Sequence, residues 1–316
     1  MTNRVLVTGG LGYIGGRVAR HLAMAGFEVC LGTRKAGLDA PPWLPGARMV
    51  HTSWDDPQSL RQACRGLSAV IHLAAMNEID SAKDLEGALR MNGLASLRML
   101  EAAVAEAVPR FVYFSTAHVY GAPLQGNLDE ATLPRPQHPY AITHKVAEDF
   151  VLAAHDKNQI EGLVFRLSNG FGAPATHEVD RWTLLVNDLC RQAAVSGRVK
   201  LNTPGTQLRD FITLEDVARA VVHGLRLDKD KLADGLFNLG KGVSSSIFAM
   251  TQRVAVRWEA LTGKSLPIDR PEPSGEEPEP LAYSSDKFKR TGFVLRDAID
   301  EEIDATLQLT RRAFGH

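Results

Sequence analysis

Residues 4–16 read RVLVTGGLGYIGG, a short apolar run that meets three spaced glycines, Gly9, Gly12 and Gly15, and continues into the helical pattern Arg17–Ala25. A pyrophosphate bound at a helix amino terminus needs backbone N–H donors, the favourable helix dipole and no side chains in the way, and spaced glycines supply that clearance. The order of strand, glycine loop and helix distinguishes such a site from a flexible turn. The segment therefore predicts a dinucleotide-binding unit.

The first half of the chain alternates short apolar runs with longer helical patterns. A helix is predicted over Gly93–Glu106, and strands are predicted at Arg4–Thr8, Glu28–Thr33, Arg48–His51, Ala69–Leu73, Arg110–Ser115 and Gly162–Arg166. This alternation is typical of a parallel sheet covered by helices on both faces. The predicted fold class is therefore α/β, with a doubly wound parallel sheet of the Rossmann type.

The second half is less regular and predicts a smaller, mixed α/β substrate-binding domain. It holds a helical pattern at Trp182–Ser196, strand candidates at Asp210–Thr213 and Leu236–Leu239, and a proline-rich surface loop at Pro267–Pro280. We expect the chain to return to the central sheet once, between Asp210 and Leu239. The expected division is a dinucleotide-binding domain of residues 1–170 plus about 210–240, and a substrate domain of residues 171–209 plus about 241–316.

Charge and composition exclude several classes of partner. Lysine plus arginine number 36 and aspartate plus glutamate 37, so the balance offers no basic footprint for nucleic acid and no cationic face for a membrane. No stretch approaches the roughly 18 apolar residues that span a bilayer, and the amino terminus lacks a signal-peptide pattern. The cysteines are three and widely spaced, which argues against both disulfides and a metal cluster. We expect a cytoplasmic protein without a metal site.

The end of the second predicted strand indicates which dinucleotide is bound. An acidic side chain there would accept hydrogen bonds from the adenosine ribose and repel a 2′-phosphate. The sequence instead ends Gly32-Thr33-Arg34-Lys35. We expect NADP to be favoured over NAD, with Arg34 as the 2′-phosphate partner. The alternative is that Arg34 and Lys35 form a solvated turn.

The residues described so far belong to a series of motifs that covers nearly the whole chain. After the glycine loop come residues 70–75 (VIHLAA), Asn92, residues 114–121 (FSTAHVYG), Pro139-Tyr140, residues 166–172 (RLSNGFG), residues 209–212 (RDFI) and residues 238–240 (NLG). In this order they resemble the extended short-chain dehydrogenase/reductase family, which contains nucleotide-sugar epimerases, dehydratases and 4-keto reductases.

The predicted chemistry is centred on Tyr140 and Thr116. Hydride transfer at a C–OH or C=O carbon requires a proton carrier at the oxygen, and a tyrosine with a lowered pKa can carry that proton. Thr116 matches the family's serine or threonine that holds the substrate oxygen. Dehydratases of the family place aspartate and glutamate directly after this residue, whereas this chain has Ala117 and His118. Water elimination is therefore disfavoured, and a 4-epimerase or a 4-keto reductase/dehydrogenase is expected.

One position departs from the family pattern. The family has lysine four residues after the tyrosine, but this chain has His144 there and Lys145 in the fifth place. At about 100° per residue, His144 lies about 40° round the helix from Tyr140 and Lys145 about 140°. His144 therefore takes the catalytic position unless a helix bulge rotates Lys145 inward. Because a histidine is largely neutral at pH 7, a dinucleotide-binding sensor or scaffold with reduced catalysis is the alternative function.

The resemblance implies further contacts. The substrate, a nucleotide-diphosphate sugar, would contact Thr116, Asn169, Arg209 and Arg270, although Arg209 could instead form an ion pair with Asp210 or Asp216. The cofactor would contact Gly9, Gly12, Tyr13, Ile14, Gly15, Arg34, Ser53, Trp54, Leu73, Ala74, Ala75, Asn92, Tyr140 and His144.

Relatives in the family dimerise through the helix near Asn92 and the helix after Tyr140, so a homodimer is expected. Met99, Val146 and Phe150 could supply the apolar contacts, or could belong to the core.

Overall fold

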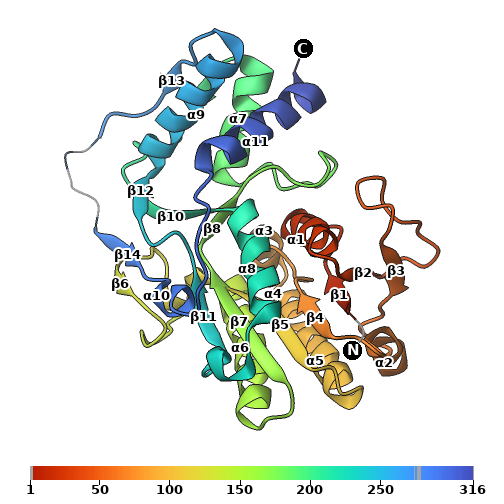
Figure 1. Ribbon diagram of the computed structural model, residues 1–316. Coiled ribbons are helices and arrows are strands. Elements are labelled where there is room, and N and C mark those ends of the chain that lie inside the picture. Colours follow the sequence, from red (N-terminus) through yellow and green to blue (C-terminus); the bar gives the residue numbers. More distant parts are fainter. Residues whose placement is uncertain (1–2, 274, 276–278, 316) are drawn as a thin grey trace.

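A parallel sheet of seven strands forms the centre of the protein, in a computed structural model that describes residues 3–273, 275 and 279–315 (Figure 1). Its spatial order is β11-β7-β5-β4-β1-β2-β3, with every neighbouring pair parallel. The strands are β1 (Arg4–Thr8), β2 (Glu28–Thr33), β3 (Arg48–His51), β4 (Ala69–His72), β5 (Arg110–Thr116), β7 (Glu161–Leu167) and β11 (Leu236–Leu239). All six strands expected in the first half are present, with ends that differ by at most one residue.

Helices cover both faces of this sheet. Successive side chains of its strands point to opposite faces and pack into two separate hydrophobic cores. Val5 and Val7 of β1 pack toward α1 (Tyr13–Met24) and α8 (Leu214–Arg226), whereas Leu6 packs toward the other face. That face is covered by α2 (Pro57–Cys64), α5 (Ala95–Ala105) and α6 (Pro139–Asp156). The expected doubly wound α/β fold is confirmed.

A smaller part packs beyond the carboxyl ends of these strands (Figure 1). Its core lies among α7 (Leu185–Ser196), α9 (Ile247–Thr262) and α11 (Ile299–Phe314). Three short sheets accompany it: β8 (Asn169–Phe171) with β10 (Leu208–Thr213) and β12 (Ser244–Ser246), β9 (Val199–Lys200) with β13 (Ile268–Asp269), and β6 (Gly126–Leu128) with β14 (Leu281–Tyr283). The remaining short helices are α3 (Glu78–Lys83), α4 (Leu85–Ala88) and α10 (Asp286–Lys289).

The two strands predicted in the second half belong to different sheets. The segment Asp210–Thr213 lies in β10 and pairs with β8 and β12, outside the central sheet. The segment Leu236–Leu239 forms β11 and pairs with β7 at the edge of the central sheet. The chain therefore returns to that sheet once, through β11.

Three helix boundaries differ from the sequence prediction. Helix α1 begins at Tyr13 rather than Arg17, because Gly15 and Gly16 are part of its first turns. The helix expected from Gly93 begins earlier, as a π-helical turn at Leu89–Leu94 that continues into α5. Helix α7 begins at Leu185 instead of Trp182.

Two other expectations concern the proline-rich loop and the cysteines. Residues 268–269 of the loop pair as β13, and residues 274 and 276–278 lie outside the described part of the chain. All three cysteines are buried free thiols. Among the described residues, no helix combines the length and the apolar character that crossing a membrane requires.

Candidate functional site

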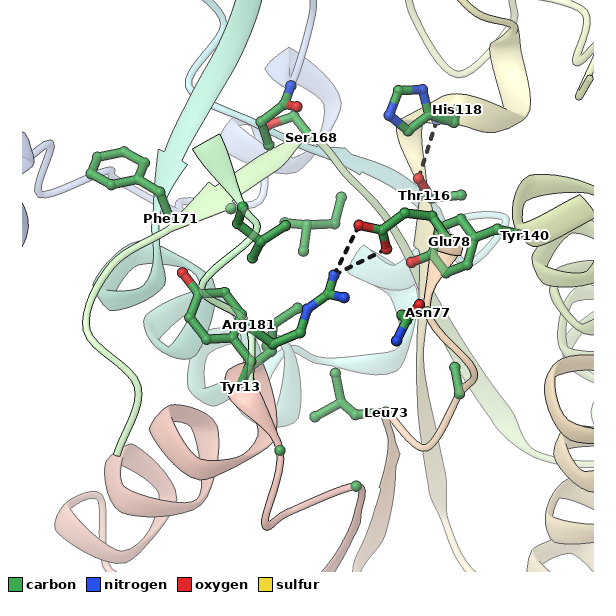
Figure 2. A pocket seen from close by; sticks show the side chains of 18 of the residues that line it. Tyr13, Leu73, Asn77, Glu78, Thr116, His118, Tyr140, Ser168, Phe171 and Arg181 are labelled. Atoms are coloured by element: carbon green, nitrogen blue, oxygen red, sulfur yellow. Dashed lines mark hydrogen bonds and ion pairs between the residues drawn. The ribbon is translucent and has the colours of Figure 1, made fainter. Parts of the chain in front are cut away.

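A cavity of about 710 Å³ lies where the carboxyl ends of β1, β4 and β5 meet the smaller part of the molecule (Figure 2). Open parallel sheets bind ligands at this edge. One end is lined by the glycine loop and by Leu73, Ala74 and Ala75 after β4. Thr116 and Tyr140 line the same cavity, as do residues 168–171 and Arg209.

The glycine loop is packed so closely that side chains are excluded. Gly9 has φ of 66°, and a Cβ there would lie 2.8 Å from the carbonyl carbon of Leu73. A Cβ on Gly15 would lie 2.1 Å from the carbonyl oxygen of Gly9. Gly12, the residue before α1, makes no side-chain capping bond, so the first N–H groups of the helix have no side-chain acceptor. This arrangement fits the pyrophosphate of a dinucleotide.

Tyr140 lies in the first turn of α6, where Pro139 starts the helix and His138 accepts a hydrogen bond from the Tyr140 N–H through Nδ1 at 3.2 Å. The pKa of its phenol is raised to about 12, chiefly by burial and then by the negative charge of Glu78, while Arg181 acts in the opposite direction. Thr116, at the end of β5, lines the same cavity and accepts a hydrogen bond from the His118 N–H at 3.2 Å. Both expected catalytic hydroxyls therefore lie in one cavity.

His144, one turn after Tyr140 on α6, packs against the tyrosine ring, with the two ring centroids 4.3 Å apart. Its Nδ1 lies 3.1 Å from the Phe114 carbonyl oxygen and 2.9 Å from the Tyr113 hydroxyl. Because a carbonyl only accepts, we assign the proton to Nδ1, which leaves Nε2 as an acceptor. Nε2 is buried and has no hydrogen-bond partner among the described residues. Burial lowers the pKa of His144 to about 4, so the ring is neutral at pH 7.

Helix α6 is regular through this region, so Lys145 is not rotated toward the tyrosine. Its ammonium group pairs with Asp149 and lies 3.7 Å from Glu148, on the outer side of the helix. The alternative of a helix bulge is therefore wrong. The tyrosine has a neutral imidazole as its neighbour on α6, where the family has a cation.

Asn92 holds the loop after β4 against α6. Its side-chain oxygen accepts a hydrogen bond from the Met76 N–H at 2.6 Å, and its amide donates to the Thr143 hydroxyl at 3.0 Å. The side chain is fully buried and does not line the cavity. Asn92 thus fixes two segments that carry cavity residues.

At the far end of the cavity, Arg209 donates a hydrogen bond to the Asn169 side chain at 3.3 Å. The alternative of an ion pair with Asp210 or Asp216 is not seen in the described residues: Asp210 accepts from Ser168, and Asp216 pairs with Arg219.

Other predicted contact residues do not line the cavity. Arg270 donates to the Pro204 carbonyl and stacks over the Phe248 ring at 3.4 Å. Arg34 is exposed at the end of β2, Ser53 is half-buried after β3, and the Trp54 indole N–H is buried without a partner among the described residues.

The cavity residues that had not been singled out as site residues include Glu78, Arg181 and His138. Arg181 donates to both oxygens of Glu78, at 3.0 and 3.3 Å, and Figure 2 shows the pair lying across the pocket. The two residues are 103 positions apart, and no local pattern links them. The position of His138 directly before Pro139 is a helix-start signal that could have identified it.

Comparison with known proteins assigns the family. The model of the NAD dependent epimerase/dehydratase family matches residues 5–240. The chain belongs to this family. It is 30% identical to a UDP-glucose 4-epimerase of Streptomyces lividans, over 90% of this chain and 89% of that protein.

Two solved structures are similar over almost the whole chain. The UDP-glucose 4-epimerase of Thermus thermophilus, in complex with NAD, has a TM-score of 0.79 at 25% identity, covering 98% of this chain and 99% of that one. MoeE5 in complex with UDP-glucuronic acid and NAD has a TM-score of 0.77 at 28% identity, with the same coverage. The expected family and the expected NAD(P)-dependent enzyme are confirmed.

The geometry of α6 predicts different effects for two neighbouring variants. We expect His144→Ala to weaken dinucleotide binding about tenfold, because the ring packs against Tyr140 and its removal leaves the buried Phe114 carbonyl without this partner. Lys145→Ala should change binding by less than about twofold, since its nearest partner is the exposed Asp149 and Lys145 does not line the cavity. Fluorescence titration with dinucleotide measures both, with thermal unfolding as the control for folding. A larger effect of Lys145→Ala would contradict the assignment.

Proposed function

We propose that this protein is a nucleotide-sugar 4-epimerase, with hydride transfer at C4 of a UDP-linked sugar as its redox step. One observation carries the proposal: Tyr140 and Thr116 line a single cavity together with the glycine loop and the Asn169–Arg209 pair. The relatives named above that act on UDP-glucose support the choice of sugar nucleotide.

The proposed roles follow from where the residues lie. The backbone of Gly9, Gly12 and Gly15 binds the dinucleotide pyrophosphate, and Asn169 with Arg209 binds the sugar diphosphate by charge-assisted hydrogen bonds. Arg270, in the proline-rich segment, contacts Pro204 and Phe248 outside the cavity, and we propose that it contacts the nucleotide. The middle of the cavity then receives the sugar ring.

At the sugar, the chain's own groups handle the proton. A bound nicotinamide dinucleotide would take the C4 hydride and give it back. As the phenolate, the Tyr140 oxygen accepts the C4–OH proton during oxidation, and as the phenol it returns this proton during reduction, while Thr116 holds the C4 oxygen in register. His144 does not line the cavity and packs against the tyrosine ring, so that its proposed part in cofactor binding is to position Tyr140. The cofactor would pack against Leu73, Ala74 and Ala75 of the loop after β4, which Asn92 holds in place.

Cofactor choice is proposed from the end of β2. Arg34 is exposed there beside Lys35, and no carboxylate ends the strand. We propose that Arg34 binds a 2′-phosphate, so that NADP is preferred to NAD, with Ser53 and Trp54 beside the adenine. The two solved neighbours described above hold NAD, so this preference would distinguish the chain from them.

The division into domains and the compartment are proposals as well. Residues 1–170 plus about 210–240 would form the dinucleotide-binding domain, which is supported by β11 in the central sheet. Residues 171–209 plus about 241–316 would form the substrate domain, which is supported by the separate core among α7, α9 and α11. The three reduced, buried thiols support a cytoplasmic protein.

An apolar face on α4, the following π-helical turn and α6 supports a homodimer. Leu85, Leu89, Ile142 and Phe150 are exposed by 42–61%. Val146 lies between Ile142 and Phe150 at helical spacing, whereas Met99 is fully buried in the core beside Cys64. We propose that two copies associate through this face.

The function is tested with a panel of nucleotide sugars. Protein is incubated with NAD or NADP and UDP-glucose, UDP-galactose, UDP-glucuronic acid or UDP-N-acetylglucosamine, while absorbance at 340 nm and the NMR spectrum of the products are recorded. We expect interconversion at C4, and Tyr140→Phe should lower its rate by about 100-fold or more because the proton carrier is lost. Full activity of Tyr140→Phe would refute the assigned role.

Cofactor preference is tested by dissociation constants at physiological salt. We expect NADP to bind about tenfold more tightly than NAD, and Arg34→Ala to remove that difference through loss of a charge-assisted hydrogen bond. Arg20→Ala, which removes an exposed arginine on α1, is the matched control. Tighter binding of NAD by the unmodified protein would end this proposal.

Self-association is tested by sedimentation velocity. We expect a dimer, and Phe150→Glu should yield monomers because it places a charge in the apolar interface. Leu133→Glu, at a loop residue exposed by 86%, is the control and should remain dimeric. A monomer at micromolar concentration for the unmodified protein would contradict the proposal.

A further inference from the structure

His138 is a cavity histidine that has no part in the C4 reaction described above. It lines the same cavity as Thr116 and Tyr140, and its side chain is half-buried. Its Nδ1 accepts a hydrogen bond from the Tyr140 backbone N–H at 3.2 Å, which caps the amino terminus of α6. No partner for its Nε2 is seen in the described part of the chain. One ring nitrogen is therefore used by the fold, and the other is available to a ligand.

The cap decides which ring nitrogen of His138 carries the hydrogen. A backbone N–H only donates, so Nδ1 must present its lone pair to the Tyr140 N–H. We therefore assign the hydrogen of the neutral ring to Nε2. A hydrogen on Nδ1 would break the cap. His138 thus offers the cavity an N–H donor that carries no charge.

The backbone on both sides of His138 fixes the position of the ring. Pro139 follows directly, Pro136 lies two residues before, and a residue before proline is restricted to extended conformations. His138 accordingly has φ of −94° and ψ of 140°. The Arg135 N–H donates to the Val119 carbonyl at 2.8 Å, which holds this segment against the turn that follows β5. The donor is therefore in place before a ligand binds, which lowers the entropic cost of binding.

The neighbours of His138 are residues proposed to act on the sugar nucleotide. The pKa of His118 is lowered, chiefly by burial and then by the positive charge of Arg209, and His138 acts in the same direction. His138 and Arg209 therefore both lie within electrostatic reach of His118. Figure 2 shows His118, Thr116 and Tyr140 on the same side of the pocket. A donor among these residues is placed to meet the sugar.

A neutral N–H donor suits one kind of acceptor. Phosphate oxygens are bound better by a charged guanidinium, such as that of Arg209. A sugar hydroxyl is uncharged, and its oxygen can accept from a neutral N–H while its hydrogen is donated elsewhere. The C4 oxygen already has Tyr140 and Thr116 as its proposed partners. The other hydroxyls of a hexose, at C2, C3 and C6, are therefore the acceptors that fit His138.

We propose that His138 is a specificity residue, which donates a hydrogen bond from Nε2 to a hexose hydroxyl at C2, C3 or C6 while Nδ1 caps the helix that carries Tyr140. Serine, threonine, asparagine and aspartate are the usual capping residues, and each can cap a helix without an imidazole. Histidine adds a second nitrogen on the far side of its ring. The proposal rests on the proposed function for the identity of the ligand as a nucleotide sugar. A site built to bond a hydroxyl rejects a sugar that lacks it.

Binding of UDP and of UDP-glucose separates this role from a structural one. Both are measured by calorimetry on the dinucleotide-bound protein, in a Tyr140→Phe background so that no sugar is converted. His138→Asn keeps a side chain that caps α6 but lacks the distant donor. We expect it to weaken UDP-glucose binding about tenfold, the loss of one hydrogen bond, and to change UDP binding by less than about twofold. Equal effects on the two ligands, or no effect on UDP-glucose, would overturn the proposal.

Three analogues identify the hydroxyl: UDP-2-deoxyglucose, UDP-3-deoxyglucose and UDP-6-deoxyglucose. The analogue that lacks the bonded oxygen should bind to His138→Asn and to its parent equally, within about twofold. The other two analogues should keep the difference of about tenfold. The same difference for all three analogues would show that His138 bonds none of these hydroxyls.

Folding and the position of the hydrogen are checked separately. His138→Asn should melt within about 1 °C of its parent, whereas His138→Ala, which loses the cap as well, should melt lower. NMR of the ring nitrogens in the unmodified protein should show the hydrogen on Nε2, and a hydrogen on Nδ1 would refute the assigned donor. Because binding is measured without turnover, this experiment and the sugar panel can fail independently of each other.

Discussion

The buried ion pair between Glu148 and Arg166 positions the helix on which the candidate site depends. Glu148 lies on α6 and is fully buried, and Arg166 on β7 binds both of its oxygens at 2.6 to 3.2 Å. Arg166 also donates to the Tyr120 hydroxyl at 2.8 Å. Removing one partner of such a pair costs about 3–5 kcal/mol, because the other charge stays buried without compensation. Tyr140 lies two turns earlier on α6, so the ion pair also fixes its position relative to the central sheet.

This anchoring explains how Lys145 comes to lie outside the site although it is only one residue from the family's lysine position. A shift of α6 by one residue would carry Glu148 away from Arg166. The register of the helix is therefore set by the buried pair, and the residue at the fourth position after Tyr140 is a histidine. The consequence is electrostatic: a neutral ring replaces a cation, and the phenol pKa stays above its usual value.

The central sheet and the glycine loop could be predicted from the sequence because their signals are local. In a strand such as β1, four consecutive residues are buried. The spacing of Gly9, Gly12 and Gly15 indicates a close approach of backbone segments, which the structure shows for Gly9 and Gly15. The place of β10 could not be predicted in this way, since its residues suit either the central sheet or a small one. Pairing between distant segments decides it, and the Glu78–Arg181 pair was missed for the same reason.

The Glu78–Arg181 pair connects the two sides of the cavity and acts on the phenol of Tyr140. Glu78 belongs to α3, after β4, whereas Arg181 belongs to the segment before α7. The beginning of that segment is held by a hydrogen bond from the Tyr13 hydroxyl to the Gly172 carbonyl oxygen. The two side chains act on the Tyr140 pKa in opposite directions. Loss of the Arg181 charge would raise the Tyr140 pKa further, and loss of the Glu78 charge would lower it. The balance of this pair, beside a neutral His144, therefore bears on how readily the buried phenol gives up its proton.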